Sequence, residues 1–499
     1  MTAQEEAHQA YQLGCSAHAR GNRHLAYDSF LRAIELDPNV SAYRLNLAIT
    51  AQSLARPADQ LNDMAYFQAS ECCRIQPDLL GNWVAFAEIA MLTHHYKEAI
   101  HAYEQALKLQ PLNARLWCLL GFVHHKIDHS EEAKQCYLKS VELDPEQGQP
   151  HFLLSTCYTG KDYDPARIAY HGEKAFTVKH KATLSLEAMW NAAHGFLGIG
   201  CYEKGWGYFE ARLHRNITNQ GRLLQSQKFE QPMWKGERDC TVLIASEMGL
   251  GDSLLLVRYF PVIEREFGVK VKFECQSSMF DLIRFNFPSV ECVTNGLAIE
   301  FDYHLPIMSL PYVCKTRADT VPWDGPYLRA EPHKISEWSC FWPLNEPGIP
   351  RIGICWSTGA NAYNPHNYDV HKKKSVPFDL LKPILDVPGV AYVSLQTGEG
   401  SEDMPNPGIK TFSDTAAILH HLDGVITVDT ALANLAGAMG MKTYLLDRFD
   451  SDWRYHDKLK QPWYPTVKPY RQTVLNDWVP VISSVVDEMK KLAASKMAA

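Results

Sequence analysis

The sequence predicts a helical repeat region followed by two α/β domains with parallel sheets. Prolines recur at positions 38, 77, 111 and 145, and the last three are 34 residues apart, a period typical of stacked helical pairs. After about residue 230, short apolar runs alternate with amphipathic helical segments, which indicates open parallel sheets. The segment 423–446 has the pattern of a buried strand, a turn, a small-residue helix and another buried strand.

Length and composition limit the possible functions. At 499 residues the chain is too long for one hydrophobic core, so about three domains are expected. The net charge of −8 argues against a nucleic-acid partner, because duplex binding needs clustered Lys and Arg. The N-terminus lacks a signal-peptide pattern, and no segment approaches 18 uninterrupted apolar residues. The 13 cysteines include no C-x-x-C pair. We therefore expect a cytoplasmic protein with reduced thiols and no integral membrane segment.

The N-terminal third contains three units in the same phase, which end at Pro38, Pro111 and Pro145. Each has small and aromatic residues at the spacing that lets two antiparallel helices interlock: Leu13, Gly14 and Phe30; Trp83, Ala87 and Tyr103; Trp117, Gly121 and Tyr137. These units resemble tetratricopeptide repeats, and the resemblance implies a curved surface that docks a peptide or protein. The alternative is that the repeats only support dimerisation or cap the remaining domains. An irregular unit, with an insertion near Ala55, precedes Pro77, and weaker helical pairs are expected at 148–180 and 185–215.

The domain boundaries follow from these patterns. We expect a repeat solenoid at 1–180, a helical connector at 181–236, a first α/β domain at 237–345 and a second at 346–499. The expected strands are 240–245, 270–275, 290–293 and 302–305 in the first domain, and 351–356, 389–395, 423–428 and 441–446 in the second. Ligands of such folds bind at the carboxyl ends of the strands.

Asp429 and Thr430 stand where a helix must begin after a buried strand. A helix start offers free N–H groups and the positive end of the dipole, which suit a phosphate. Thr430 adds a hydroxyl, and Asp429 could cap the helix or hold a ribose hydroxyl. The alternative is an ordinary capped crossover helix.

A second turn, from Ser246 to Asp252, follows the first expected strand of the first α/β domain. Gly249 and Gly251 let the backbone turn tightly, with Glu247 at the start of this acceptor-side loop. A third glycine of the dinucleotide pattern is missing, so an NAD site is not expected. Asp252 falls in the first helical turn, where a carboxylate can act as general base for a hydroxyl acceptor. The alternative role of Asp252 is a helix cap.

Further candidates lie in the second α/β domain. Hydroxyl, amide and ammonium donors able to surround a diphosphate or touch the nucleotide are Trp356, Ser357, Thr358, Gly359, Lys374, Ser375 and Gln396. A satisfied loop amide is an equal interpretation of Gln396. Asp450 and Asp452 form a D-x-D pattern, but it comes after the last expected strand, and no metal site is expected.

A series of short motifs occurs in a specific order from about residue 185 to the end. They are G-W-x-x-x-E-x-R at 205–212, W-x-G at 234–236, E-x-G-L-G-D at 247–252, R-Y at 258–259, S-L-P at 309–311, S-L-Q at 394–396, D-T-A at 414–416 and V-I-T-V-D-T-A-x-A-x-L-A-G-A-x-G at 425–440. With the repeats, this series resembles the bacterial tetratricopeptide proteins that carry a heptosyltransferase-like, family 9 glycosyltransferase domain. The plan is also similar to that of O-GlcNAc transferase.

The resemblance implies a GT-B pair of Rossmann-like domains, a nucleotide-sugar held mainly by the second domain, and inverting transfer without a metal or other cofactor. By this resemblance Asp252 matches the base, while Asp429, Thr430 and Ala431 match the turn that binds the donor diphosphate. Asn434 belongs to the same donor-binding set, but it stands where heptosyltransferases have His, so the resemblance implies nucleotide binding without implying an ADP-heptose donor.

We therefore expect a glycosyltransferase that moves a sugar from a nucleotide-sugar to a hydroxyl acceptor on a protein recruited by the repeats. One alternative is a glycan or lipid-linked acceptor, with repeats that are only structural. Another is a non-catalytic repeat adaptor whose transferase domain has decayed. The sequence leaves the sugar, the nucleotide, the acceptor and the formation of a homo-oligomer open.

Overall fold

The protein is described by a computed structural model that covers residues 2–55, 60–214, 229–294, 299–339, 348–358, 373–397, 404–455 and 462–497. The chain forms two compact units. One unit is Met1–Cys157 with Glu173–Ser185, and the other is Tyr158–Gly172 with Leu186–Ala499. No helix in these described ranges is both long and apolar enough to cross a membrane.

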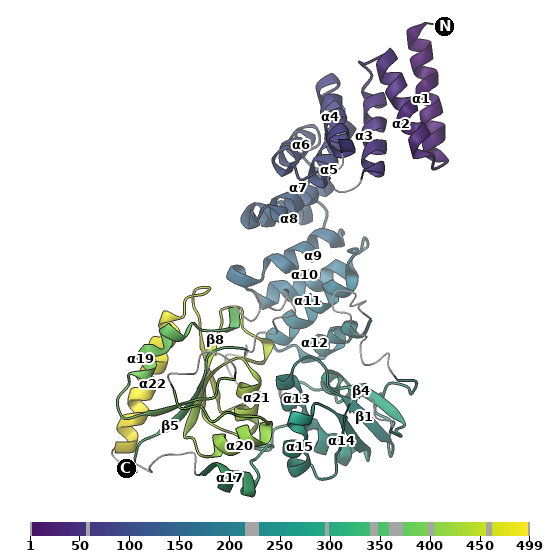
Figure 1. Ribbon diagram of the computed structural model, residues 1–499. Helices are drawn as coiled ribbons and strands as arrows, with labels where there is room; N and C mark the ends of the chain where they lie inside the picture. The colour runs from purple at the N-terminus through teal and green to yellow at the C-terminus, as the bar shows by residue number, and fades with distance from the viewer. Residues whose placement is uncertain are drawn as a thin grey trace. The chain divides into compact units, whose positions relative to one another are not determined.

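The first unit is a stack of antiparallel helical pairs (Figure 1). Its helices are α1 (Ala3–Ala19), α2 (Arg23–Leu36), α3 (Ser41–Leu54), α4 (Gln60–Ile75), α5 (Leu80–Leu92), α6 (Tyr96–Leu109), α7 (Ala114–Lys126), α8 (Ser130–Leu143) and α9 (Gly148–Cys157). The predicted solenoid is confirmed. The expected insertion near Ala55 falls mostly on residues 56–59, which lie outside the described residues.

The helices interlock where the sequence pattern places small residues opposite aromatic ones. A Cβ on Gly121 of α7 would lie 2.7 Å from Cε1 of Tyr137 on α8, so only glycine lets the ring pack this closely. The indole N–H groups of Trp83 and Trp117 donate to the carbonyl oxygens of Pro77 and Pro111, at 2.6 and 2.9 Å. Because each tryptophan bonds the carbonyl of the proline that ends the preceding unit, these two units share one local structure.

This packing predicts opposite effects for two glycine-to-alanine changes. Gly121→Ala should destabilise the α7–α8 pair by about 1–3 kcal/mol, because the methyl group overpacks against Tyr137. Gly81→Ala in α5 meets no atom within 4 Å and should stabilise its helix by up to about 1 kcal/mol. Amide hydrogen exchange of α7, α8 and α5 measures both effects, and equal protection in the two variants would contradict this account of the repeat packing.

The second unit begins with the N-terminal part of α10 (Pro165–Thr177), followed by α11 (Ser185–Gly198) and α12 (Tyr202–Phe209). A four-stranded sheet follows in the order β3-β2-β1-β4, with all pairs parallel. Its elements are β1 (Thr241–Ala245), α13 (Leu250–Leu256), α14 (Phe260–Phe267), β2 (Lys270–Glu274), α15 (Phe280–Asn286), β3 (Glu291–Val293), β4 (Tyr303–Pro306), α16 (Leu310–Val313) and α17 (Pro332–Trp338).

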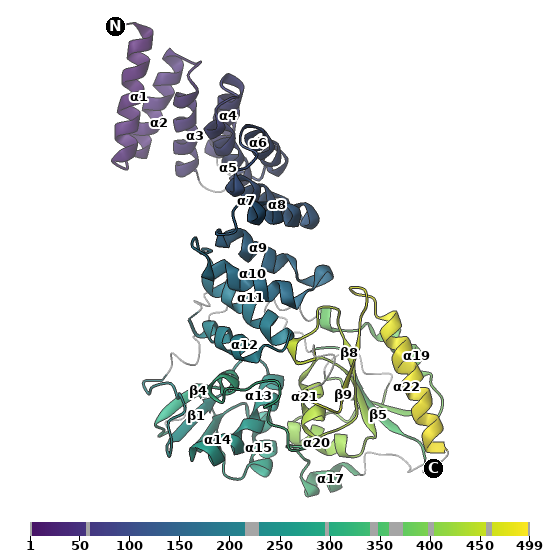
Figure 2. The same ribbon diagram turned by 180° about the vertical axis from the view of Figure 1, so that it is seen from behind.

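The second sheet is also parallel and has the order β6-β5-β7-β8-β9. Its elements are β5 (Arg351–Cys355), α19 (Lys382–Leu385), β6 (Ala391–Ser394), α20 (Phe412–His420), β7 (Gly424–Val428), α21 (Ala431–Ala438), β8 (Thr443–Asp447), β9 (Val467–Arg471) and α22 (Val479–Met497). The two views show α19 and α22 on one face of this sheet and α20 and α21 on the other (Figures 1 and 2).

The two predicted parallel sheets are therefore confirmed, but the sequence analysis missed β9. This segment contains Pro469 and two basic residues, which are unusual in a central parallel strand. Its place at the edge of the sheet explains the difference, because an edge strand has neighbours on only one side and tolerates proline and charge.

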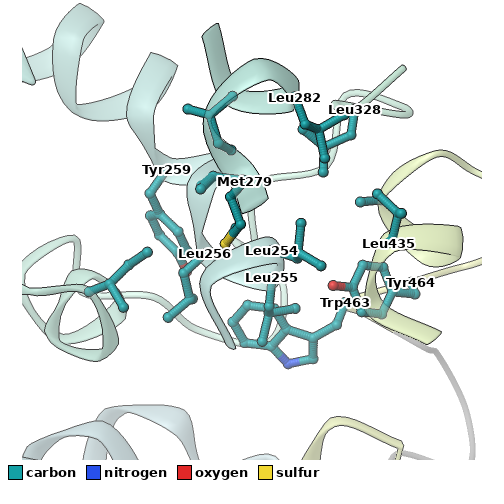
Figure 3. Packing of buried hydrophobic residues seen from close by; sticks show 14 of the residues in the cluster. Leu254, Leu255, Leu256, Tyr259, Met279, Leu282, Leu328, Leu435, Trp463 and Tyr464 are labelled. Atoms are coloured by element: carbon teal, nitrogen blue, oxygen red, sulfur yellow. The ribbon is translucent and has the colours of Figure 1, made fainter. Parts of the chain in front are cut away.

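One hydrophobic cluster joins the helices of the two sheets. Figure 3 shows Leu254 and Leu255 of α13 in this cluster together with Leu435 of α21 and the rings of Trp463 and Tyr464. All five are buried. Because burial of large apolar side chains contributes about 1.5–3 kcal/mol each, this cluster holds the start of α13 against the start of α21.

Candidate active site

The first turns of α13 and α21 meet. A Cβ on Gly251 would lie 2.7 Å from Nδ2 of Asn434 and 3.4 Å from Cα of Ala431. Each helix follows the carboxyl end of a parallel strand, β1 for α13 and β7 for α21. The two turns predicted from sequence to carry function, 246–252 and 429–431, are therefore neighbours.

Asp252 is held from two sides. Its Oδ2 accepts the N–H of Gly249 at 2.8 Å, which makes Asp252 a cap of α13, and its Oδ1 pairs with a guanidinium N–H of Arg454. Burial raises the pKa of Asp252 above its ordinary value, although Arg454 acts in the opposite direction. Asp452 and Asp429 add to the rise, because nearby negative charges disfavour ionisation. The carboxylate thus caps the helix, and its pKa is higher than that of an exposed aspartate.

Arg454 connects Asp252 of α13 with the loop that follows β8. It lies in the short turn Trp453–Tyr455 after β8, and its guanidinium contacts Asp252 and also Asp452, the latter at 2.9 Å. Burial acts to raise the pKa of Asp452, but Arg454 and Lys374 outweigh it, so this pKa is lowered. Asp452 is therefore the firmly ionised partner of Arg454, whereas Asp252 is the more easily protonated one.

The start of α21 contains the residues expected to hold a diphosphate. Thr430 is the N-cap, has extended backbone geometry and does not cap the helix with its side chain, because its hydroxyl lies 3.3 Å from that of Thr427. Asp429 pairs with Lys374, with 2.6 Å between Nζ and Oδ2. Ala431 follows as the first helical residue. Lys374 therefore lies at this helix start, where its ammonium group forms an ion pair with the carboxylate of Asp429.

The carboxyl end of β5 forms a second group of polar side chains. Oε1 of Gln396 accepts the backbone N–H of Ser357 at 3.0 Å and that of Trp356 at 3.3 Å. Oγ of Ser375 accepts the N–H of Thr358 and donates to Oγ of Ser357, both at 3.2 Å. Gln396 is therefore the satisfied loop amide that the sequence left as one interpretation.

Trp356 and Gly359 also belong to the residues expected at the donor site. The Trp356 ring is buried against Phe378, with 4.8 Å between ring centroids, so it supports the turn from below. Gly359 lies outside the described residues.

Asn434 has a structural role that the sequence analysis did not foresee. It is 3% exposed, its Nδ2 donates to the carbonyl of Thr430 at 3.0 Å, and its Oδ1 accepts the hydroxyl of Tyr464 at 3.1 Å. Gly251 packs directly on it. The side chain therefore fills the junction between α13 and α21.

Glu247 stabilises the loop that presents Asp252. Its two carboxylate oxygens accept N–H groups of Arg212 at 2.6 and 3.1 Å, and one also accepts the backbone N–H of Met308. Arg212 pairs in addition with Glu210, and Ser309 bonds both of these residues. Three motifs that are distant in sequence thus converge on one buried ion cluster, defined here as Glu210, Arg212, Glu247 and Ser309.

Both aspartates of the D-x-D pattern form ion pairs with arginines. Asp450 pairs with Arg448 at 3.4 Å, and Asp452 pairs with Arg454. No group of three or more His, Cys, Asp and Glu side chains in the described ranges is placed to hold a metal ion. An open hollow of about 460 Å³ lies on α15 and α17, and none of the candidate residues lines it.

The sequence analysis did not select Arg454 or Tyr455, although both lie at the centre of this site. A signal was present in the run from Asp450 to Tyr455, where acidic and basic residues flank a tryptophan directly after a buried strand. Isolated charges in a late loop look solvated, and only the burial of Arg454 shows their role.

The repeat period and the interlocked helices agree with matches to known protein families. Residues 10–40 and 114–147 match the tetratricopeptide repeat, and residues 95–128 match a related repeat of the same class. The N-terminal helical region is a tetratricopeptide-repeat region. Its solved relatives include a structure titled for functional characterization of PilF from Pseudomonas aeruginosa, with 17% identity and a TM-score of 0.36, which covers 46% of this chain and 98% of that one. Another is MamA from Desulfovibrio magneticus, with 20% identity, a TM-score of 0.31 and coverage of 34% and 92%.

Two curated relatives match different shares of the chain. The chain is 25% identical over 437 residues to Protein FlbA of Caulobacter vibrioides. This match covers 80% of this chain and 70% of FlbA. It is 29% identical over 175 residues to the type IV pilus assembly protein PilF of Pseudomonas aeruginosa, which covers 33% of this chain and 66% of PilF. A match over 80% of the chain is longer than the repeat region, so the FlbA similarity includes part of the two-sheet unit.

Proposed function

We propose that the two-sheet unit is a GT-B glycosyltransferase that moves a sugar from a nucleotide-sugar to a hydroxyl group of a protein docked on the tetratricopeptide repeats. The observation that carries this proposal is the meeting of Asp252 with the start of α21. A partly buried carboxylate with a raised pKa and a helix start without a side-chain cap suit base-assisted transfer from a diphosphate.

Each group has a separate role in this mechanism. Asp252 accepts the proton of the acceptor hydroxyl as its oxygen attacks the anomeric carbon. The bond from that carbon to the diphosphate oxygen breaks, and the electron pair leaves with the diphosphate. The N–H groups at the start of α21, Lys374, and the donors after β5 at Ser357 and Thr358 stabilise the developing negative charge. Inversion follows from this single displacement, and no step needs a metal.

Nucleotide binding is the first test of the proposal. A nucleoside diphosphate should bind the intact protein with a dissociation constant below about 1 mM, or about −4 kcal/mol. Calorimetric titration of UDP, GDP, ADP, dTDP and CMP measures this. If none of them binds, the transferase proposal fails.

The role of the repeats can be tested by truncation. Removal of residues 1–146, which contain α1–α8, should abolish transfer to a protein acceptor and leave nucleotide binding unchanged. The reason is that stacked repeats present a continuous surface for an extended partner, whereas the expected donor site lies wholly in the second unit. Circular dichroism confirms folding of the shortened protein. Equal transfer rates before and after truncation would favour a glycan or lipid-linked acceptor.

A second candidate function is a non-catalytic adaptor. The pairing of Asp252 with Arg454 favours it, because a carboxylate engaged by a guanidinium is a weaker base. Nucleotide binding and turnover distinguish the two candidates.

A further inference from the structure

The guanidinium group of Arg454 has an N–H donor, at Nε, that neither of its two carboxylate partners accepts. Its side chain is 9% exposed and contacts Asp252 and Asp452, but its Nε has no hydrogen-bond partner among the described residues. A buried guanidinium N–H without an acceptor is costly, because it has lost water without gaining a bond.

The next residue has the same property. Tyr455 is 2% exposed, and its hydroxyl is buried and lacks a hydrogen-bond partner in the described ranges. Burial raises the pKa of Tyr455 well above its ordinary value, and the charge of Asp429 raises it further, so the group remains a neutral O–H donor. Two adjacent buried donors therefore lack acceptors close to the start of α21.

The charges nearby determine what these donors can bind. Among the described residues, the carboxylates of Asp252, Asp429 and Asp452 lie near Lys374 and Arg454, and Arg448 also acts on Asp452. An added anion therefore needs a cation that one of these carboxylates now holds. Asp252 is suited to release its cation, since burial and the neighbouring aspartates already disfavour its ion pair by raising its pKa.

We propose that Arg454 is shared between Asp252 and the diphosphate of the donor. In the empty site the guanidinium pairs with Asp252, and a bound diphosphate takes over this contact and accepts from Nε and the Tyr455 hydroxyl. Without the neighbouring cation, the ionised Asp252 carboxylate is a stronger base, and it accepts the proton of the acceptor hydroxyl. Donor binding thus activates the base, and this inference rests on the proposed glycosyl transfer.

The shared Arg454 and a purely structural Asp252–Arg454 ion pair predict opposite effects of Asp252→Asn on nucleotide affinity. Asp252→Asn removes the competitor for Arg454, so the nucleoside diphosphate should bind about 5-fold or more tightly than to the unaltered protein. Arg454→Gln should weaken binding by about 10-fold or more, as expected for loss of a charged hydrogen bond. In the double variant the gain from Asp252→Asn should disappear.

Tyr455→Phe tests the second donor without disturbing an ion pair. The change removes a hydroxyl that has no partner among the described residues, so stability should be unchanged or higher, while affinity should fall by about 3–10-fold. Tyr444→Phe is the matched control. The Tyr444 hydroxyl is also buried and lacks a partner among the described residues, but it lies in the hydrophobic cluster beneath α22, so affinity should not change.

The measurement is calorimetric titration of UDP, GDP, ADP and dTDP into the full-length protein and each variant, in two buffers of different ionisation enthalpy. At acidic pH, where Asp252 is partly protonated, loss of the Arg454 contact should make binding take up a proton in the unaltered protein but not in Asp252→Asn. Equal affinity and equal proton uptake in both proteins would overturn the sharing, even if Arg454→Gln fails to fold. Absence of any nucleotide binding to the unaltered protein would instead overturn the proposed function.

Discussion

Asp252→Asn should lower the rate of sugar transfer by about 10²–10⁴-fold while the protein stays folded. The asparagine side chain keeps an oxygen for the N–H of Gly249, so the cap of α13 is preserved. It cannot accept a proton from the acceptor hydroxyl, so the general-base contribution is lost. Single-turnover transfer from a labelled nucleotide-sugar measures the effect, and near-normal turnover would leave Asp252 with only its capping role.

The pH dependence of transfer provides an independent check. Only the ionised form of Asp252 is a base, and burial raises its pKa against the opposing charge of Arg454. Asp452 and Asp429 also face it and raise its pKa. The rate should therefore fall as the pH is lowered through a value above the ordinary aspartate pKa of about 3.9. Asp252→Asn should remove this acid limb, whereas a limb that persists in the variant would assign the titration to another group.

The second large effect concerns stability. Arg212→Met should reduce the free energy of unfolding of the second unit by up to about 3–5 kcal/mol, because Glu210 and Glu247, which are 17% and 11% exposed, would lose their cation. Arg212 is 2% exposed, and its pairing distances to the two carboxylates are 2.5 and 2.6 Å. Urea unfolding followed by tryptophan fluorescence measures the loss.

Arg265→Ala is the matched control for this change. Arg265 also pairs with a glutamate, Glu266, but its side chain is 65% exposed and the distance is 3.5 Å. Exposed pairs contribute about 0–1 kcal/mol, so this variant should remain close to the unaltered protein. Equal stability of the two variants would show that the buried ion cluster is not what holds the loop before Asp252.

The local patterns of the sequence determined most of the secondary structure. The 34-residue spacing and the Gly121–Tyr137 pairing identified the repeats, because helix packing within one repeat depends on residues close in sequence. Continuous apolar runs identified the parallel strands for a similar reason: a strand covered on both faces needs apolar side chains throughout. β9 was missed, since its edge position relaxes that requirement.

The sequence also placed Asp252 and Asp429–Ala431 at helix starts, but it could not say what their side chains contact. The partners of Asp252 are Gly249, three residues before it, and Arg454, about two hundred residues after it. Only the contact with Arg454 depends on tertiary structure, and this contact affects the pKa of the Asp252 carboxylate. The same applies to Asn434, which the family resemblance placed at the donor site and which the packing of α13 on α21 buries.

The sequence by itself therefore determined the elements, their order and the turns at which chemistry is expected, because these depend on periodicity and on residues within a few positions of each other. The tertiary structure alone decided the charges at the site: Lys374 against Asp429, Arg454 between Asp252 and Asp452, and Arg212 between two glutamates. The physical reason is that the strength of an ion pair and the pKa of a carboxylate depend on distance and burial in space, which separation along the chain does not specify.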